Sequence, residues 1–123
     1  MPVAIYLRSA TFRRSDEEDS LRAQRNAISA YCDRHRLNVF REYEDNGVGG
    51  YEPLASRPEG SRLMSDASER KFDKLLVCTL DRLGRSATDV VRAVEHFERL
   101  GITVEAVSQP GAVAFISNSE LAG

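Results

Sequence analysis

The sequence predicts a single α/β domain, a mostly parallel β-sheet of about four or five strands with helices packed on it. Two observations predict this class. Short apolar runs, typical of buried strands, alternate along the chain with segments whose apolar residues recur at helical spacing. The length of 123 residues also fits one domain with its own hydrophobic core. We expect right-handed crossovers between successive strands.

The first predicted strand covers residues 3–7, a continuous apolar run that begins after Pro2, and we expect its carboxyl end to deliver Arg8 to the surface. Residues 11–19 are polar and end in an acidic run, so we expect a flexible loop that places acids before a helix N-terminus. Apolar residues at helical spacing then predict a helix from residue 20 to about residue 34.

The middle of the chain predicts two more strands and a helix. Residues 39–43 alternate in polarity, which is typical of a strand, and residues 45–50 form a turn-rich loop. Pro58 is well placed in the first turn of the second helix. The apolar run over residues 75–80 predicts the third strand.

Ser86 begins the last predicted helix, because its spacing to Asp89 fits a capping box. The helix ends at Gly101, which suits a left-handed cap, and residues 103–107 predict the fourth strand. We assign residues 1–110 to the domain. Residues 111–123 are expected to form an irregular tail, because they are small and polar without a helical stripe.

The charge pattern narrows the function. A formal net charge of −2 argues against a protein that coats nucleic acid through bulk electrostatics. Lysine occurs only at Lys71 and Lys74, and arginine's planar fork suits bidentate phosphate contacts, although a genome rich in G and C gives the same bias. Neither a signal-peptide pattern nor a membrane-length apolar stretch is present, so we expect a cytoplasmic protein without a membrane partner.

Metal, nucleotide and disulfide chemistry are not predicted. Cys32 and Cys78 lack the spacing of metal sites and redox pairs, so two buried reduced thiols are favoured over an inter-element disulfide. The glycines at positions 47, 49 and 50 favour a simple turn over a phosphate cradle, because no Gly-Lys-Ser/Thr element follows. We therefore expect no metal ion, no nucleotide and no other cofactor.

The strongest candidate for a functional site is the run from Asp81 to Arg85, which follows the third predicted strand and precedes a helix. Two guanidinium groups and a carboxylate near a helix N-terminus provide a place to hold phosphate. Arg8 and Asp45 also follow predicted strands, and the carboxyl ends of parallel strands share one edge of a sheet. A solvated charged turn is the alternative interpretation of this run.

Over about residues 3–107, the chain resembles the catalytic domain of serine recombinases, the group of resolvases, invertases and large serine integrases. The resemblance rests on motifs in this order and spacing: Tyr6-Leu7-Arg8, Ser20-Leu21-Arg22-Ala23-Gln24, Asp45-x-Gly47, Gly50, Arg57-Pro58, Phe72-Asp73 and Leu80-Asp81-Arg82-Leu83-Gly84-Arg85-Ser86. The Ser-Leu-x-x-Gln and Arg-Pro-Glu-Gly elements look more like the large integrases than the small resolvases.

The resemblance implies a reaction and a site. In the family, a serine hydroxyl attacks a DNA phosphodiester and forms a 5′-phosphoserine link inside a tetramer, without metal or nucleotide. By position, the donors that stabilise the added negative charge of the transition state would be Arg8, Arg57, Arg82 and Arg85. Asp81 matches an acid that orients an arginine or moves a proton, and Gln24 and Asp45 match residues that support the pocket.

Ala10 departs from the family pattern, which is Arg-x-Ser, because it occupies the nucleophile position two residues after Arg8. Three interpretations stay open: an introduced change that inactivates the protein, a natural loss of cleavage, and a nucleophile shifted to Ser9 or Thr11. Neighbouring residues of a strand point to opposite faces, so we expect Ser9 to face away from the side of Arg8.

Two further departures concern the rest of the family pattern. Gly49 stands where the family loop usually carries a serine, which affects local contacts and not the fold. The sequence ends at Gly123, so we expect it to lack the family's long dimerisation helix and DNA-binding domain. The resemblance implies DNA as partner, a homodimer or homotetramer for the intact protein, and association with the nucleoid.

Two rival functions were weighed. The first is a non-catalytic module that keeps the fold and assembles on DNA or with an active partner. The second is a receiver-like signalling domain, which needs an acidic cluster after the first strand. Residues 8–10 are Arg-Ser-Ala and supply none, so the sequence disfavours this second rival.

Overall fold

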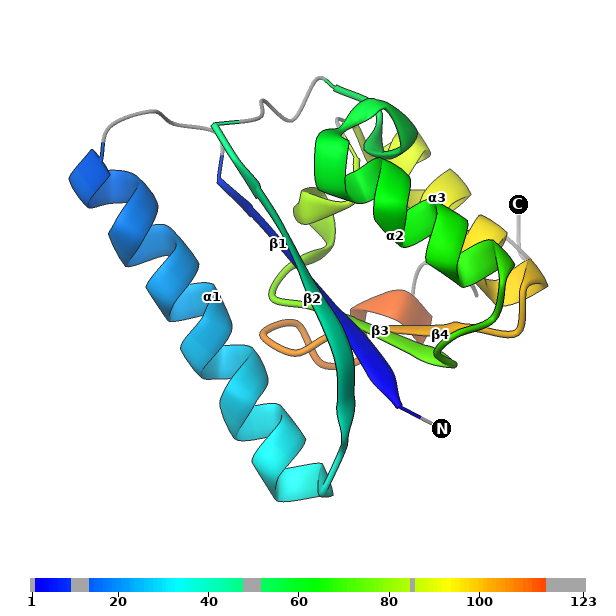
Figure 1. Ribbon diagram of the computed structural model, residues 1–123, viewed down its shortest axis with the longest axis horizontal. Helices are drawn as coiled ribbons and strands as arrows, with labels where there is room; N and C mark the ends of the chain where they lie inside the picture. Colours follow the sequence, from blue (N-terminus) through cyan, green and yellow to red (C-terminus); the bar gives the residue numbers. More distant parts are fainter. Residues whose placement is uncertain (1, 10–13, 48–51, 85, 115–123) are drawn as a thin grey trace.

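The computed structural model describes residues 2–9, 14–47, 52–84 and 86–114. Within them, four parallel strands form one sheet, as the sequence predicts, and the structure gives their order as β2-β1-β3-β4 (Figure 1). The strands are β1 (Val3–Ser9), β2 (Val39–Asn46), β3 (Lys74–Val77) and β4 (Thr103–Ala106). The helices are α1 (Arg14–His35), α2 (Pro58–Ser68) and α3 (Ala87–Arg99), with 3₁₀ turns η1 (Leu54–Ser56) and η2 (Leu80–Arg82).

Helices cover both faces of the sheet, and β1 shows how its side chains divide between them (Figure 1). Ala4 and Tyr6 belong to the apolar cluster that includes residues of α2 and α3, whereas Ile5 and Leu7 belong to the cluster built with α1. All seven residues of β1 are buried. This alternation follows from the two-residue period of a strand, and it gives the central strand two different environments.

Three predicted boundaries are wrong by three residues or more. Helix α1 begins at Arg14, so most of the loop predicted over residues 11–19 is helical, and residues 11–13 lie outside the described residues. The first turns of a helix can form without an apolar stripe, because acidic residues interact favourably with the helix N-terminus. Strand β2 continues to Asn46, where it still pairs with Ser9, and ends before Gly47, whose φ of 65° is left-handed.

The third wrong boundary is the end of β3. The strand stops at Val77, and Leu80 belongs to the turn η2 rather than to the strand. An apolar run does not distinguish a strand residue from a buried turn residue, and Leu80 is buried in the α2/α3 cluster.

The helix starts follow their predicted chemistry. Pro58 occupies the first turn of α2, and the Ser86 hydroxyl accepts a hydrogen bond from the Asp89 amide at 3.2 Å. Gly101 follows α3 with a φ of 80°.

Of the tail predicted over residues 111–123, residues 112–114 are helical, and residues 115–123 lie outside the described part of the chain. Among the described helices, none is long and apolar enough to cross a membrane.

Candidate active site

Three arginines from separate segments meet at the carboxyl edge of the sheet. Arg8 is near the end of β1, Arg82 lies in η2 after β3, and Arg57 immediately precedes α2. Arg82 Nη1 donates to the Arg8 carbonyl at 3.2 Å, and Arg57 Nη1 donates to the Arg82 carbonyl. We call Arg8, Arg57 and Arg82 the arginine cluster.

The arginine cluster brings positive charges together in a setting where Arg8 and Arg57 are buried and Arg82 is partly buried. Arg8 is 6% exposed, so the expectation that the end of the first strand delivers it to the surface is wrong, and Arg57 is fully buried. Burial lowers the pKa of Arg8, and the neighbouring charges of Arg57 and Arg82 lower it further. The charges of Arg57 and Arg82 therefore oppose the positive charge of Arg8. Such an arrangement gains stability when an anion enters it, because opposite charge favours the ionised form of each guanidinium.

Arg57 forms the inner part of the cluster. Its Nε donates to the Glu52 carbonyl at 2.9 Å, and its Nη1 donates to the Tyr6 hydroxyl at 3.1 Å as well as to the Arg82 carbonyl. Its guanidinium carbon is 6.0 Å from the Tyr6 ring centroid. One side chain thus joins β1, the segment before η1, and η2.

Asp45 caps helix α2 from the neighbouring strand. Its Oδ1 accepts from the Glu59 amide at 2.9 Å, and its Oδ2 accepts from the Gly60 amide at 3.0 Å. The residue at the N-cap position is Arg57, which makes no side-chain capping bond. Because Asp45 occupies these two amides, they are engaged by the protein and not presented to a ligand.

Tyr6 is a residue of the site to which the sequence analysis gave no role beyond the first strand and the motif Tyr6-Leu7-Arg8. Its hydroxyl donates to Asp45 Oδ2 at 2.8 Å and accepts from Arg57 Nη1. Burial raises the pKa of this phenol, so it stays protonated. The sequence does carry a signal for these hydrogen bonds, a tyrosine inside an apolar strand two residues before Arg8, because a buried phenol needs a hydrogen-bond partner.

Gln24 of α1 holds the backbone of Arg8. The Arg8 amide donates to Gln24 Oε1 at 3.3 Å, and Gln24 Nε2 donates to the Arg8 carbonyl at 2.9 Å. Strand β3 pairs with β1 only as far as Ile5. Beyond Ile5, the backbone groups of β1 that point away from β2 therefore need another hydrogen-bond partner. The side-chain amide of Gln24 replaces the missing strand there, which explains why it is only 2% exposed.

Ser9 lies in a different environment from Arg8. Neighbouring side chains of a strand point to opposite faces, so the Ser9 side chain lies on the same face as Leu7, which packs in the cluster built with α1. Ser9 is 2% exposed, and its hydroxyl has no hydrogen-bond partner among the described residues.

The run after β3 combines an exposed acid with a close-packed turn. The Asp81 side chain is 73% exposed, accepts from the Thr79 hydroxyl and lies 3.7 Å from Arg82 Nε. A Cβ on Gly84 would stand 2.8 Å from the Val90 amide nitrogen, so this position needs glycine for η2 to approach α3. The predicted site residues Ala10 and Arg85 lie outside the described residues, as do Thr11 and Gly49.

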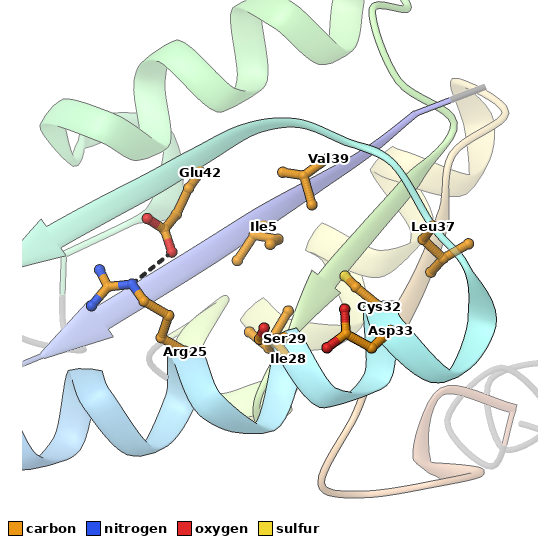
Figure 2. A pocket seen from close by; sticks show the side chains of 9 residues that line it. All are labelled: Ile5, Arg25, Ile28, Ser29, Cys32, Asp33, Leu37, Val39 and Glu42. Atoms are coloured by element: carbon orange, nitrogen blue, oxygen red, sulfur yellow. Dashed lines mark hydrogen bonds and ion pairs between the residues drawn. The ribbon is translucent and has the colours of Figure 1, made fainter.

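A separate cavity lies on the α1 face of the sheet, away from the arginine cluster. A cavity of about 360 Å³ lies between α1 and strands β1 and β2, with Arg25 donating to Glu42 at its rim (Figure 2). Its lining includes Ile5, Ile28 and Cys32. Among the described residues, no cluster of potential metal ligands occurs. Both cysteines are free thiols, Cys32 buried as predicted and Cys78 only partly buried.

Comparison with known proteins gives one family. The family described as "Resolvase, N terminal domain" matches residues 3–120. No curated protein matches the sequence.

Solved structures agree in fold. The N-terminal catalytic domain of TP901-1 integrase is 28% identical, with a TM-score of 0.84 over 99% of this chain and 93% of that chain. A resolvase family site-specific recombinase from Streptococcus pneumoniae is 22% identical, with a TM-score of 0.74 over 99% and 87%. The C-terminal catalytic domain of ISC1926 TnpA, an IS607-like serine recombinase, is 21% identical, with a TM-score of 0.75 over 98% and 80%.

Proposed function

The chain belongs to the resolvase N-terminal domain family and is a resolvase-type serine recombinase catalytic domain, and from this premise we propose that its arginine cluster binds a DNA phosphodiester. With a serine at position 10, the domain would cleave and rejoin DNA. With Ala10, it binds the phosphodiester without cleaving it.

The meeting of three guanidinium groups at one buried edge is the observation that carries this proposal. Arg8 and Arg82 are joined through the Arg8 carbonyl, and Arg57 is joined to Arg82 through the Arg82 carbonyl. A phosphodiester carries a negative charge that three neighbouring guanidinium groups attract and can bind through charge-assisted hydrogen bonds. In the transition state the phosphoryl oxygens carry more negative charge, so donors placed in advance lower the barrier.

In the proposed chemistry a hydroxyl at position 10 attacks phosphorus. The oxygen–phosphorus bond to serine forms, the bond from phosphorus to the 3′ oxygen breaks, and a proton passes from the serine hydroxyl to that oxygen. Asp81 orients an arginine or carries the proton, and Arg85 adds a fourth donor. Gln24 and Asp45 support the site through the Arg8 backbone and helix α2.

Ala10 stops this reaction because a methyl group has no lone pair to attack phosphorus. Ser9 does not replace it in our proposal, because Ser9 falls on the α1 face of β1 and is 2% exposed. Thr11 remains the other hydroxyl near the nucleophile position.

Ala10 also favours a second candidate function, a recombinase-like module without catalysis that acts in an assembly on DNA or with an active partner. Resolvase and integrase domains act on DNA and oligomerise in general. For the intact protein we propose DNA as the partner, a homodimer or homotetramer, no metal or nucleotide cofactor, and a cytoplasmic location with association to the nucleoid.

Covalent capture tests the proposal. The domain is fused to an unrelated site-specific DNA-binding module, given a nicked target, and compared with its Ala10→Ser variant on a denaturing gel. We expect an adduct only with Ala10→Ser. Ser9→Ala in both backgrounds is the control, and we expect it to change neither result.

The other outcomes separate the candidates. An adduct in the unaltered chain that disappears with Ser9→Ala identifies Ser9 as nucleophile, and one that persists points to Thr11. DNA binding without an adduct in either chain favours the non-catalytic module.

A further inference from the structure

We propose that Gln109, in the loop after β4, is a positioning residue of the arginine cluster. Its side chain holds the start of η2 and thereby sets where Arg82 stands toward a bound phosphate. This inference rests on the proposed function, since it concerns how the same site is built. It gives a role to a residue that lies outside the arginine cluster and outside every motif of the sequence analysis.

A hydrogen bond joins the loop after β4 to the start of η2. Gln109 Oε1 accepts from the Leu80 amide at 3.0 Å. Leu80 is the first residue of η2, and the first amides of a helical turn have no carbonyl partner within the turn. Thr79 precedes η2 but makes no capping bond, and its hydroxyl donates to Asp81 instead. The side chain of Gln109 therefore supplies the acceptor that the N-terminus of η2 lacks.

The main chain that carries Gln109 is itself held against the loop after β3. The Val107 amide donates to the Val77 carbonyl at 2.9 Å, and the Ser108 amide donates to the Cys78 carbonyl at 3.0 Å. These bonds continue the pairing of β4 with β3 beyond the end of β4. The Gln109 amide donates within its own loop. Its side chain thus continues the series of contacts where the backbone no longer can, and it does so from a fixed base.

The other end of η2 belongs to the arginine cluster. The carbonyl of Arg82 accepts from Arg57, and Arg82 Nη1 donates to the Arg8 carbonyl at 3.2 Å. Because η2 has only three residues, a shift of its first residue moves its last. The Leu80 side chain packs in the α2/α3 cluster, but apolar packing is non-directional. The hydrogen bond from the Leu80 amide therefore fixes the orientation of η2, and with it the place of Arg82.

The surroundings of Gln109 allow a clean test. Gln109 is exposed and belongs to neither apolar cluster of the described residues. Gln109→Met keeps an unbranched side chain of similar size but removes the amide acceptor, and exposed substitutions change stability little. Ser108 provides a matched control. It is the exposed neighbour on the same loop, and its hydroxyl lies 3.2 Å from Cys78 Sγ rather than at η2.

The test compares the unaltered chain with Gln109→Met, Gln109→Glu and Ser108→Ala by NMR. Hydrogen exchange of the Leu80 amide reports the contact itself, and the Arg82 Nε–H signal during titration with inorganic phosphate reports the site. With Gln109→Met we expect faster exchange at Leu80 and about fivefold lower phosphate affinity, as for the loss of one neutral hydrogen bond. Gln109→Glu keeps an acceptor oxygen and should keep the Leu80 amide protected. Ser108→Ala should change neither reading.

The outcomes distinguish this inference from the proposed function. If Gln109→Met leaves phosphate affinity as it is, or if Ser108→Ala lowers it equally, the positioning role of Gln109 is wrong and the proposed function stands. If the unaltered chain does not bind phosphate at these arginines, both are overturned. In the Ala10→Ser background, Gln109→Met should slow adduct formation about fivefold relative to Ser108→Ala, by the same reasoning.

Discussion

The two faces of the paired strands β1 and β2 differ in kind, although their residues alternate along the same chain. On one face, Tyr6 and Asp45 join a buried hydrogen-bonded network with Arg57. On the other, Leu7 packs under α1, and Glu44 forms a half-exposed ion pair with Arg25. A shift of one residue therefore moves a side chain from a polar buried network to a packing surface.

The difference teaches where specificity and stability reside. Polar groups buried on the α2/α3 face depend on one another, so losing one leaves its partners unsatisfied. The α1 face depends on apolar packing, where the loss of stability increases with the volume of the side chain removed. Disturbance of the first face should alter both stability and phosphate binding, whereas disturbance of the second should alter stability alone.

Asp45→Ala should have the largest effect. It removes the acceptor of the Tyr6 hydroxyl and of two α2 amides and leaves Arg57 without this carboxylate nearby, which should lower the free energy of unfolding by about 3–5 kcal/mol. Urea unfolding measures it. Its neighbour Glu44 is the control, because Glu44→Ala removes a half-exposed ion pair worth about 1 kcal/mol or less. Equal losses would contradict the difference between the faces.

Ile28→Ala tests the apolar face. Ile28 is a fully buried residue of α1 and borders the cavity of Figure 2, so truncation should cost about 2–4 kcal/mol through lost burial and an enlarged cavity. Phosphate affinity at the arginine cluster should stay unchanged when measured well below the Tm. A matching loss of affinity would show that the two faces are coupled more strongly than we infer.

Gln24→Ala tests a contact between α1 and the arginine cluster. It leaves the Arg8 amide without its side-chain acceptor and removes one donor from the Arg8 carbonyl, which should cost about 1–3 kcal/mol. Phosphate affinity should fall as well, because the backbone of Arg8 is released. The exposed neighbour Arg22 supplies the control, since Arg22→Ala should leave unfolding within about 0.5 kcal/mol.

Asp66 provides the smallest effect, and it depends on pH. Burial acts to raise the pKa of Asp66, but bonds from Tyr43 and Lys71 and the charge of Arg41 outweigh it, so the pKa is lowered. A lowered pKa stabilises the fold above the unfolded value of about 3.9, and this contribution is lost as pH falls through the folded value.

The comparison of the unaltered chain with Asp66→Asn measures this contribution. The difference in unfolding free energy should be about 1 kcal/mol near pH 7 and shrink below about pH 4. Phosphate affinity at pH 7 should not change, because Asp66 contacts Arg41, Tyr43 and Lys71. A difference that grows in acid would contradict the direction of the shift.

Much of the fold followed from pattern alone. The apolar runs that contain Ile5 and Leu76 became buried strands, and Ser86 and Gly101 bounded α3 as their chemistry indicates. The boundaries that failed lie where pattern carries little information. The start of α1 has no apolar stripe, and Leu80 is apolar in a turn as it would be in a strand.

The sequence by itself determined the succession of strands and helices along the chain, the arginines at strand ends and the alanine at position 10, because periodicity and turn chemistry are local properties. Only the tertiary structure decided that Arg57 is fully buried, that Asp45 caps a helix from another strand, and that Tyr6 stands between them. These residues are far apart in sequence, and hydrogen bonds between side chains depend on how strands and helices pack. Burial then makes each of those bonds necessary, since a buried polar group without a partner destabilises the fold.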